Sequence, residues 1–154
     1  ILDETRNLIV EHLDYGNEII HDGMDISLCS YDTETGKMQF AGANNPLWIV
    51  RNGAFLEFKG DRQPVGYFEK SKDFTNNSID IENGDMVFVF SDGFSDQFGG
   101  LKGKKYKLGN LKNFILSINE TKFSAYSSVL ENEFNLWKGD NEQVDDVCVL
   151  GIKF

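Results

Sequence analysis

The chain has 154 residues, of which 40% are hydrophobic and 26% are charged, a composition typical of one globular domain. Its formal net charge of −10 argues against a nucleic-acid partner, because an acidic surface repels a phosphate backbone. No apolar run approaches the roughly 18 residues that a membrane span needs, so we expect no membrane contact by this segment.

The first half of the chain predicts one helix followed by antiparallel strands. Apolar residues recur near helical spacing over residues 2–13, with charged residues between them. Strict alternation, or a short apolar run bounded by turn residues, predicts strands at residues 24–31, 38–43, 47–50 and 54–58. The pair Asn52 and Gly53 favours a type I′ turn, so the last two of these strands should form a hairpin.

The second half of the chain predicts further strands and two helices. Strands are predicted at residues 73–81, 86–91 and 147–152, helices at residues 108–118 and 123–137, and a Gly- and Lys-rich surface loop at residues 93–107. Residues 1–154 should therefore form a single α+β domain with antiparallel sheet.

The two cysteines indicate a reducing environment. Cys29 and Cys148 each lie within a predicted strand, so we expect two buried free thiols and no disulfide. Together with the lack of a recognisable signal peptide, this favours a cytoplasmic location.

Acidic residues occur where two apolar strands end or begin. Asp92, followed by Gly93, comes directly after the continuous apolar run at residues 86–90, and Asp145 and Asp146 precede the last strand. Carboxylates fixed at the ends of rigid strands are suitable ligands for a hard divalent cation. The alternative is that these are turn residues, since Asp-Gly is a frequent turn pair.

Five motifs in order resemble one bacterial family. They are DGMDISLC at residues 22–29, AGANNPL at 41–47, QPVG at 63–66, GDMV through SDGFSD at 84–96, and DDVCV at 145–149. Together they resemble the SpoIIE-type branch of the metal-dependent protein serine/threonine phosphatases, the type 2C class. The resemblance extends over nearly the whole chain.

The resemblance implies two antiparallel β-sheets packed as a sandwich and flanked by helices. It also implies a site for two Mn²⁺ or Mg²⁺ ions that hydrolyses phosphoserine or phosphothreonine by a metal-activated water. By position, Asp92 and Asp145 resemble metal ligands, and Asp146 resembles a neighbour that orients the site. Arg62, beside the QPVG motif, is a candidate contact for the substrate phosphate.

The chain departs from the family pattern in one respect. The family has a further metal aspartate in a Gly-Asp-x-x-Gly-His-Gly-like segment on its first strands, and no such segment occurs here. We therefore expect this chain to be the C-terminal portion of the catalytic domain, incomplete at its N-terminus. On its own it should bind Mn²⁺ weakly and be inactive or nearly so. Sheet edges left uncovered should favour pairing with a second copy, giving a homodimer.

The resemblance also implies partners. These are a phosphorylated regulatory protein of the anti-sigma-factor antagonist type, in a bacterial partner-switching pathway, and an N-terminal sensor module in the parent chain. The alternative is a non-catalytic pseudophosphatase that serves as a protein-interaction domain. Retention of Asp92, Asp145 and Asp146 argues against that alternative, because a scaffold does not need acidic residues at these strand ends. The cluster Lys102, Lys104, Lys105 and Lys107 could steer a phosphoprotein, although lysines in a Gly-rich loop are usually solvated.

Overall fold

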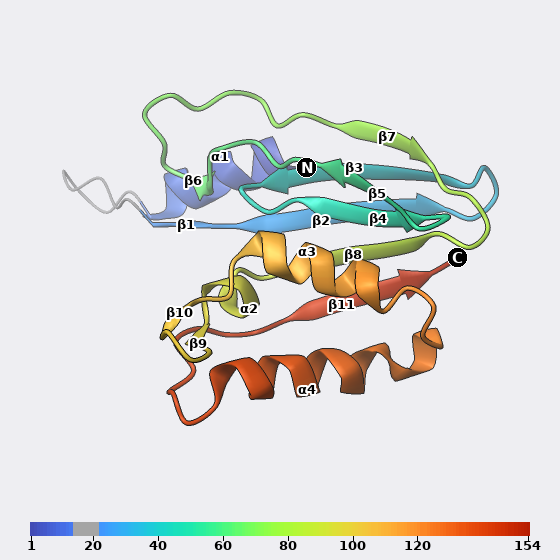
Figure 1. Cartoon of the computed structure of the whole chain (residues 1–154). Helices are drawn as coiled ribbons and strands as arrows, with labels where there is room; N and C mark the ends of the chain where they lie inside the picture. Colours follow the sequence, from blue (N-terminus) through green and yellow to red (C-terminus); the bar gives the residue numbers. More distant parts are fainter. Residues whose placement is uncertain (14–21) are drawn as a thin grey trace.

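Two antiparallel sheets form the centre of the computed structural model, which describes residues 1–13 and 22–154 (Figure 1). One sheet has the strand order β11 (Val149–Lys153), β8 (Met86–Phe90), β4 (Leu47–Arg51) and β5 (Ala54–Phe58). The other has the order β2 (Ile26–Asp32), β3 (Lys37–Ala43) and β7 (Asn77–Asp80). Two short ribbons pair β1 (Gly23–Met24) with β6 (Val65–Gly66), and β9 (Phe98–Gly99) with β10 (Lys104–Lys105). The helices are α1 (Leu2–Leu13), α2 (Gly93–Asp96), α3 (Leu108–Ser117) and α4 (Tyr126–Lys138), the last preceded by a 3₁₀ turn at Phe123–Ala125.

The two sheets pack face to face through one set of alternating side chains. Leu47 and Ile49 of β4 and Val87 of β8 are buried against Met38 and Phe40 of β3. Because successive side chains of a strand point to opposite faces, this set leaves the intervening residues of β4 and β8 for the other side of the sheet.

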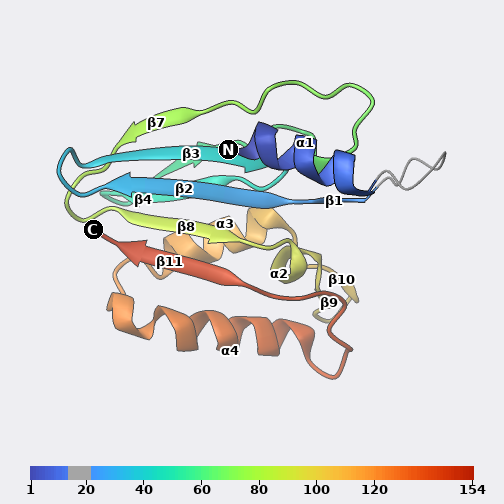
Figure 2. The same cartoon turned by 180° about the vertical axis from the view of Figure 1, so that it is seen from behind.

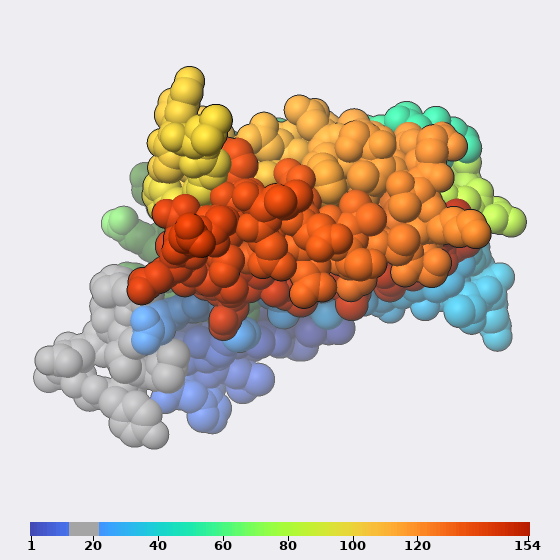
Figure 3. Space-filling model, turned by 60° about the horizontal axis from the view of Figure 1, so that its bottom comes forward, coloured from blue at the N-terminus to red at the C-terminus, as the bar shows by residue number. Residues whose placement is uncertain are grey.

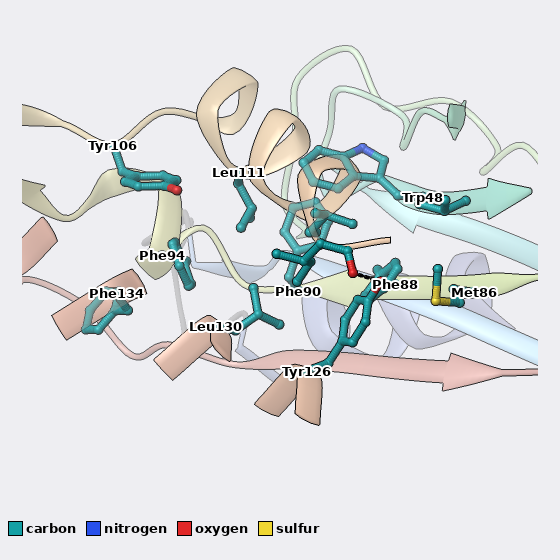
Figure 4. Packing of buried hydrophobic residues seen from close by; sticks show 13 residues of the cluster. Trp48, Met86, Phe88, Phe90, Phe94, Tyr106, Leu111, Tyr126, Leu130 and Phe134 are labelled. Atoms are coloured by element: carbon teal, nitrogen blue, oxygen red, sulfur yellow. Dashed lines mark hydrogen bonds between the residues drawn. The ribbon is translucent and has the colours of Figure 1, made fainter. Parts of the chain in front are cut away.

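That other side carries the aromatic core beneath α3 and α4 (Figure 4). Trp48 packs against Phe90 with ring centroids 4.2 Å apart, and Phe88 stacks on Tyr126 of α4 at 6.0 Å. Strand β8 is therefore covered on both faces, and it pairs with β4 on one edge and β11 on the other. This explains why residues 86–90 form an uninterrupted apolar run.

Helix α1 covers the outer face of the three-stranded sheet (Figure 2). Leu2 and Ile9 of the helix join Ala43 of β3, Val65 and Phe74 in a third apolar cluster. The order of layers is thus helices, four-stranded sheet, three-stranded sheet and helix. The predicted α+β sandwich is confirmed.

The hairpin prediction is confirmed in detail. Strands β4 and β5 pair from Leu47 opposite Phe58 to Arg51 opposite Ala54. Asn52 and Gly53 between them have φ values of 51° and 74°. Positive φ at both central positions defines the type I′ turn.

Two predictions from the sequence are wrong. Residues 93–107 are not a simple surface loop: they contain α2 and the β9–β10 ribbon, and Phe94 and Tyr106 are buried, although the four lysines of the segment are exposed. Cys29 and Cys148 are exposed free thiols, not buried ones. Cys29 lies on β2 and Cys148 directly precedes β11. Each of these two strands has one neighbouring strand among the described residues, and Leu150 on β11 is 53% exposed. Within the described ranges, no helix is both long and apolar enough to cross a membrane.

A buried ion pair fixes the start of β8. Asp85 is 1% exposed and accepts two hydrogen bonds from the Arg51 guanidinium, at 2.8 and 2.6 Å, and one from the N–H of Glu82 at 2.9 Å. Burial alone would raise the pKa of Asp85. The hydrogen bonds and positive charge of Arg51, with the bond from Glu82, lower the pKa more, so it lies below its ordinary value.

We predict that Asp85→Asn destabilises the fold by about 3–5 kcal/mol, because it leaves the Arg51 charge without its buried partner. Since the folded-state pKa of Asp85 lies below its unfolded value, this contribution is present above the unfolded value and is lost as pH falls through the folded one. The measurement is urea unfolding at pH 7 and at about pH 3. Asp80→Asn is the control, because Asp80 is 83% exposed in its 3.6 Å pair with Lys37 and should change stability little. Equal stability of wild type and Asp85→Asn at pH 7 would contradict this account.

Candidate metal and phosphate site

The site begins where β8 leaves the four-stranded sheet. The Ser91 N–H donates to the carbonyl of Cys148 at 2.9 Å, which extends the pairing of β8 and β11 by one step. The Ser91 hydroxyl donates to the Asp146 carbonyl at 2.8 Å and accepts a hydrogen bond from the Cys148 N–H at 2.9 Å. One serine side chain therefore holds the segment of the second acidic pair against the end of β8.

Gly93 brings the two segments into direct backbone contact. A Cβ atom at this position would overlap the carbonyl oxygen of Asp146 and would also press on Val147. Only glycine allows this approach, which is the structural reason for the Asp-Gly pair. The backbone carbonyl of Asp92 accepts hydrogen bonds from the Asp96 N–H at 2.9 Å and the Ser95 hydroxyl at 3.0 Å, so it forms the first turn of α2.

The carboxylates themselves are exposed. Neither Asp92 nor Asp146 makes a side-chain hydrogen bond or ion pair to any residue that the structure describes. One carboxylate oxygen of Asp145 accepts from the N–H of Asp146 at 2.7 Å, and its backbone carbonyl accepts from Gln143 at 2.8 Å. The carboxylates of Asp92 and Asp146 thus retain both oxygens, and that of Asp145 retains one, for an external cation.

A buried glutamine that the sequence patterns did not single out supports this arrangement. Gln97 is fully buried, and its side-chain amide donates to the carbonyl of Glu142 at 2.8 Å and accepts from the N–H of Val144 at 3.3 Å. It therefore fixes the loop that leads into Asp145. In the sequence, Gln97 stands out only by its position a few residues after the end of β8.

The structure brings some predicted site residues together and leaves one apart. Asp92, Gly93 and Asp146 lie at one junction through the contacts described above, and Asp145 directly precedes Asp146. Arg62 is exposed in the connection between β5 and β6, with no hydrogen bond to any described residue. No hydrogen bond or ion pair joins it to the carboxylates.

The donor chemistry fits a hard divalent cation, but the ligand set is partial. Carboxylate oxygens are the preferred ligands of Mg²⁺, and Mn²⁺ shares this preference. Among residues 1–13 and 22–154, no group of three or more His, Cys, Asp or Glu side chains is close enough to hold an ion. The described residues therefore bring two carboxylate-bearing segments together.

A groove of about 640 Å³ lies next to this junction, between α4 and β11. Phe88, Phe94 and Tyr126 are among its lining residues, and Gln143 and Val147 border it beside the acidic segment. Neither Asp92 nor Asp145 lines it, so the groove is separate from the candidate ligands.

Solved structures identify the class of this fold. The SiaA-PP2C domain of Pseudomonas aeruginosa matches with a TM-score of 0.87 and 23% identity, covering 99% of this chain and 59% of that one. The PP2C phosphatase domain of SpoIIE from Bacillus subtilis, solved with a fragment of its regulatory domain, matches with a TM-score of 0.68 and 18% identity, covering 99% and 49%. The catalytic domain of the phosphatase PstP, in complex with two manganese ions, matches with a TM-score of 0.65 and 14% identity, covering 94% and 64%. The fold is that of PP2C phosphatase domains, and the chain spans about half to two thirds of these structures.

The family is defined by sequence. The family model of stage II sporulation protein E, SpoIIE, matches residues 1–154, so the chain belongs to the SpoIIE family. Comparison with curated protein sequences gives no match.

We predict that Gly93→Ala destabilises the fold by about 1–3 kcal/mol, because the new methyl group must displace the Asp146 carbonyl. Gly109→Ala is the matched control. Gly109 lies in α3, where an added Cβ atom would have no neighbour within 4 Å, so alanine there should stabilise the helix by about 0.5–1 kcal/mol. Thermal unfolding of both variants measures the difference. A Gly93→Ala protein as stable as wild type would show that the junction is not closely packed.

Proposed function

We propose that this chain contributes to metal-dependent hydrolysis of phosphoserine or phosphothreonine on a regulatory protein. The observation that carries the proposal is the junction of Ser91 and Gly93 with Asp146, which places two carboxylate-bearing segments at one end of the sandwich. Membership of the SpoIIE family supports it.

In this proposal Asp92 and Asp145 hold the metal, and Asp146 orients the segment. Mn²⁺ or Mg²⁺, when bound, would supply a water of lowered pKa and positive charge beside the phosphoryl oxygens. Ser91 and Gln97 keep the two ligand-bearing segments in register, which a reaction that depends on positioning requires. The two manganese ions of the PstP complex support the choice of metal.

We further propose that residues 1–154 are the C-terminal portion of a longer phosphatase domain. Two carboxylates are fewer than a two-metal site needs, so the remaining ligands would come from another segment. The exposed apolar residues Leu150 and Ile152 on β11 are consistent with a strand that covers them in the complete domain. The edges of β2 and β11 that have no partner strand among the described residues would also allow the proposed homodimer.

One of the proposed partners is supported by a relative. The SpoIIE structure includes a fragment of a regulatory domain, which supports a sensor module upstream in the parent chain. We also propose that the protein is cytoplasmic and that its substrate is an anti-sigma-factor antagonist. Arg62 remains a candidate for the substrate phosphate, because its side chain is exposed and has no partner among the described residues.

A second candidate function is a non-catalytic interaction domain. The absence of a three-residue metal cluster within the described ranges favours it. The two candidates predict different results in a hydrolysis assay. A phosphatase needs Asp92 for activity, whereas an interaction domain hydrolyses no phosphate ester.

We predict that Mn²⁺-dependent hydrolysis of para-nitrophenyl phosphate by the longer protein falls about 100-fold or more in Asp92→Asn, because a metal ligand is lost. Asp73→Asn is the control: Asp73 is exposed, directly precedes Phe74 of the α1 layer, and its side chain makes no hydrogen bond or ion pair with any described residue. The chain of 154 residues should show little or no activity in the same assay. Equal activity of wild type and Asp92→Asn would refute the ligand assignment, and no activity in the longer wild-type protein would favour the interaction domain.

A further inference from the structure

Residues 98–107, called here the basic ribbon, carry a concentrated positive charge on an acidic chain. They comprise β9, β10, the turn between them and the residues up to α3. Four of the fifteen Lys and Arg residues lie within six positions, Lys102, Lys104, Lys105 and Lys107, and no Asp or Glu lies in the ribbon. The chain as a whole has a net charge of −10.

Three of these four lysines have no partner in the described parts of the chain. Lys105 pairs with Asp96 at 2.6 Å and lies over the ring of Phe98 at 5.9 Å from its centroid. The side chains of Lys102, Lys104 and Lys107 are exposed and make no hydrogen bond or ion pair there. Their charges are therefore not neutralised by nearby carboxylates of the same molecule.

The base of the ribbon is held firmly, unlike that of a solvated loop. The Gly100 N–H donates to the carbonyl of Trp137 at 2.8 Å, and the Tyr106 N–H donates to the carbonyl of Gln97 at 2.9 Å. The ring of Tyr106 is buried between Phe94 and Trp137, each with its centroid 5.1 Å away. A ribbon anchored in this way presents its tip in a defined position, which lowers the entropy lost on binding.

The ribbon combines positive charge with exposed apolar surface. Leu101 is completely exposed, and Phe98 is 43% exposed. In Figure 3 this part of the chain, drawn in yellow, projects beyond the surface formed by α3 and α4. An apolar residue among unpaired lysines is suited to contact a protein segment that carries both acidic and apolar side chains.

The ribbon lies at the same end of the sandwich as the candidate metal ligands (Figures 1 and 2). Helix α2 joins Asp92 directly to the ribbon, and Gln97 contacts both the ribbon and the loop that precedes Asp145. A protein segment bound along the ribbon would therefore lie close to the carboxylates.

We propose that the basic ribbon binds an acidic stretch of the phosphoprotein substrate and so directs the phosphorylated residue to the site; this substrate role rests on the function proposed above. Lys102, Lys104 and Lys107 attract the acidic side chains, and Leu101 contacts an apolar one. An anionic lipid surface is a less suitable partner, because the net charge of −10 opposes approach of the whole molecule to it.

The test uses a fluorescein-labelled peptide with one phosphoserine flanked by four glutamates, and the same peptide with glutamine in place of each glutamate. Binding is measured by fluorescence anisotropy without metal, so the result does not depend on catalysis. The variant is Lys102→Gln with Lys104→Gln, which leaves the Lys105–Asp96 pair in place. The matched control is Lys59→Gln with Lys70→Gln, which removes the same charge from two exposed lysines elsewhere that have no partner among the described residues.

We expect the ribbon variant to bind the acidic peptide about 3- to 10-fold more weakly than wild type and the control to bind as wild type does. The difference should shrink at high salt, because the screening length falls from about 10 Å at 0.1 M to about 3 Å at 1 M. Equal binding by wild type and the ribbon variant, or equal binding of the two peptides, would overturn the proposal. Binding to phosphatidylserine vesicles but not to the peptide would also overturn it. After any of these results the para-nitrophenyl phosphate assay would still decide the proposed function, since that substrate has no acidic segment for the ribbon to bind.

Discussion

The position of strand β8 is the constraint on which the candidate site depends. Its side chains are buried on both faces, and its backbone pairs with β4 on one edge and β11 on the other. A shift of one residue would move rings such as Phe88 from the helix-covered face into the layer between the sheets, so the register is strongly fixed. The Arg51–Asp85 pair holds the start of the strand. The point at which the chain leaves the sheet is therefore fixed, and Asp92 is fixed with it.

Three residues hold the second acidic segment, residues 145 and 146, against the end of β8. The Ser91 hydroxyl and the close approach of Gly93 hold the backbone of Asp146, and the amide of Gln97 holds the loop before it. The backbone of Gln97 also accepts a hydrogen bond from the Trp137 indole at 3.0 Å, which connects the site to α4 and to the base of the basic ribbon. The exposed carboxylates and the exposed lysines are thus presented by one buried framework, and rigid support of this kind is what binding sites require.

Local patterns in the sequence predicted most of the helices, strands and turns, because each pattern depends on the spacing of residues within one such element. The apolar run at residues 86–90 and the turn at Asn52 and Gly53 are examples, and both are found as predicted. The sequence also indicated that the acidic residues lie at strand ends. It could not show that Gln97 contacts residues more than forty positions away, because such contacts depend on how elements pack. For the same reason the Gly and Lys content of residues 93–107 predicted only a surface loop and did not show that Phe94 and Tyr106 in that segment are buried beneath α4.

The central claim is that Asp92 and Asp145 are metal ligands, and Mn²⁺ binding measured by electron paramagnetic resonance tests it most directly. Titration of the 154-residue chain should show weak Mn²⁺ binding that falls about 10-fold or more in Asp92→Asn and in Asp145→Asn. Asp146→Asn should have a smaller effect, because that side chain is assigned an orienting role, and Asp73→Asn should have none. Mn²⁺ binding that is the same in wild type, Asp92→Asn and Asp145→Asn would contradict the claim.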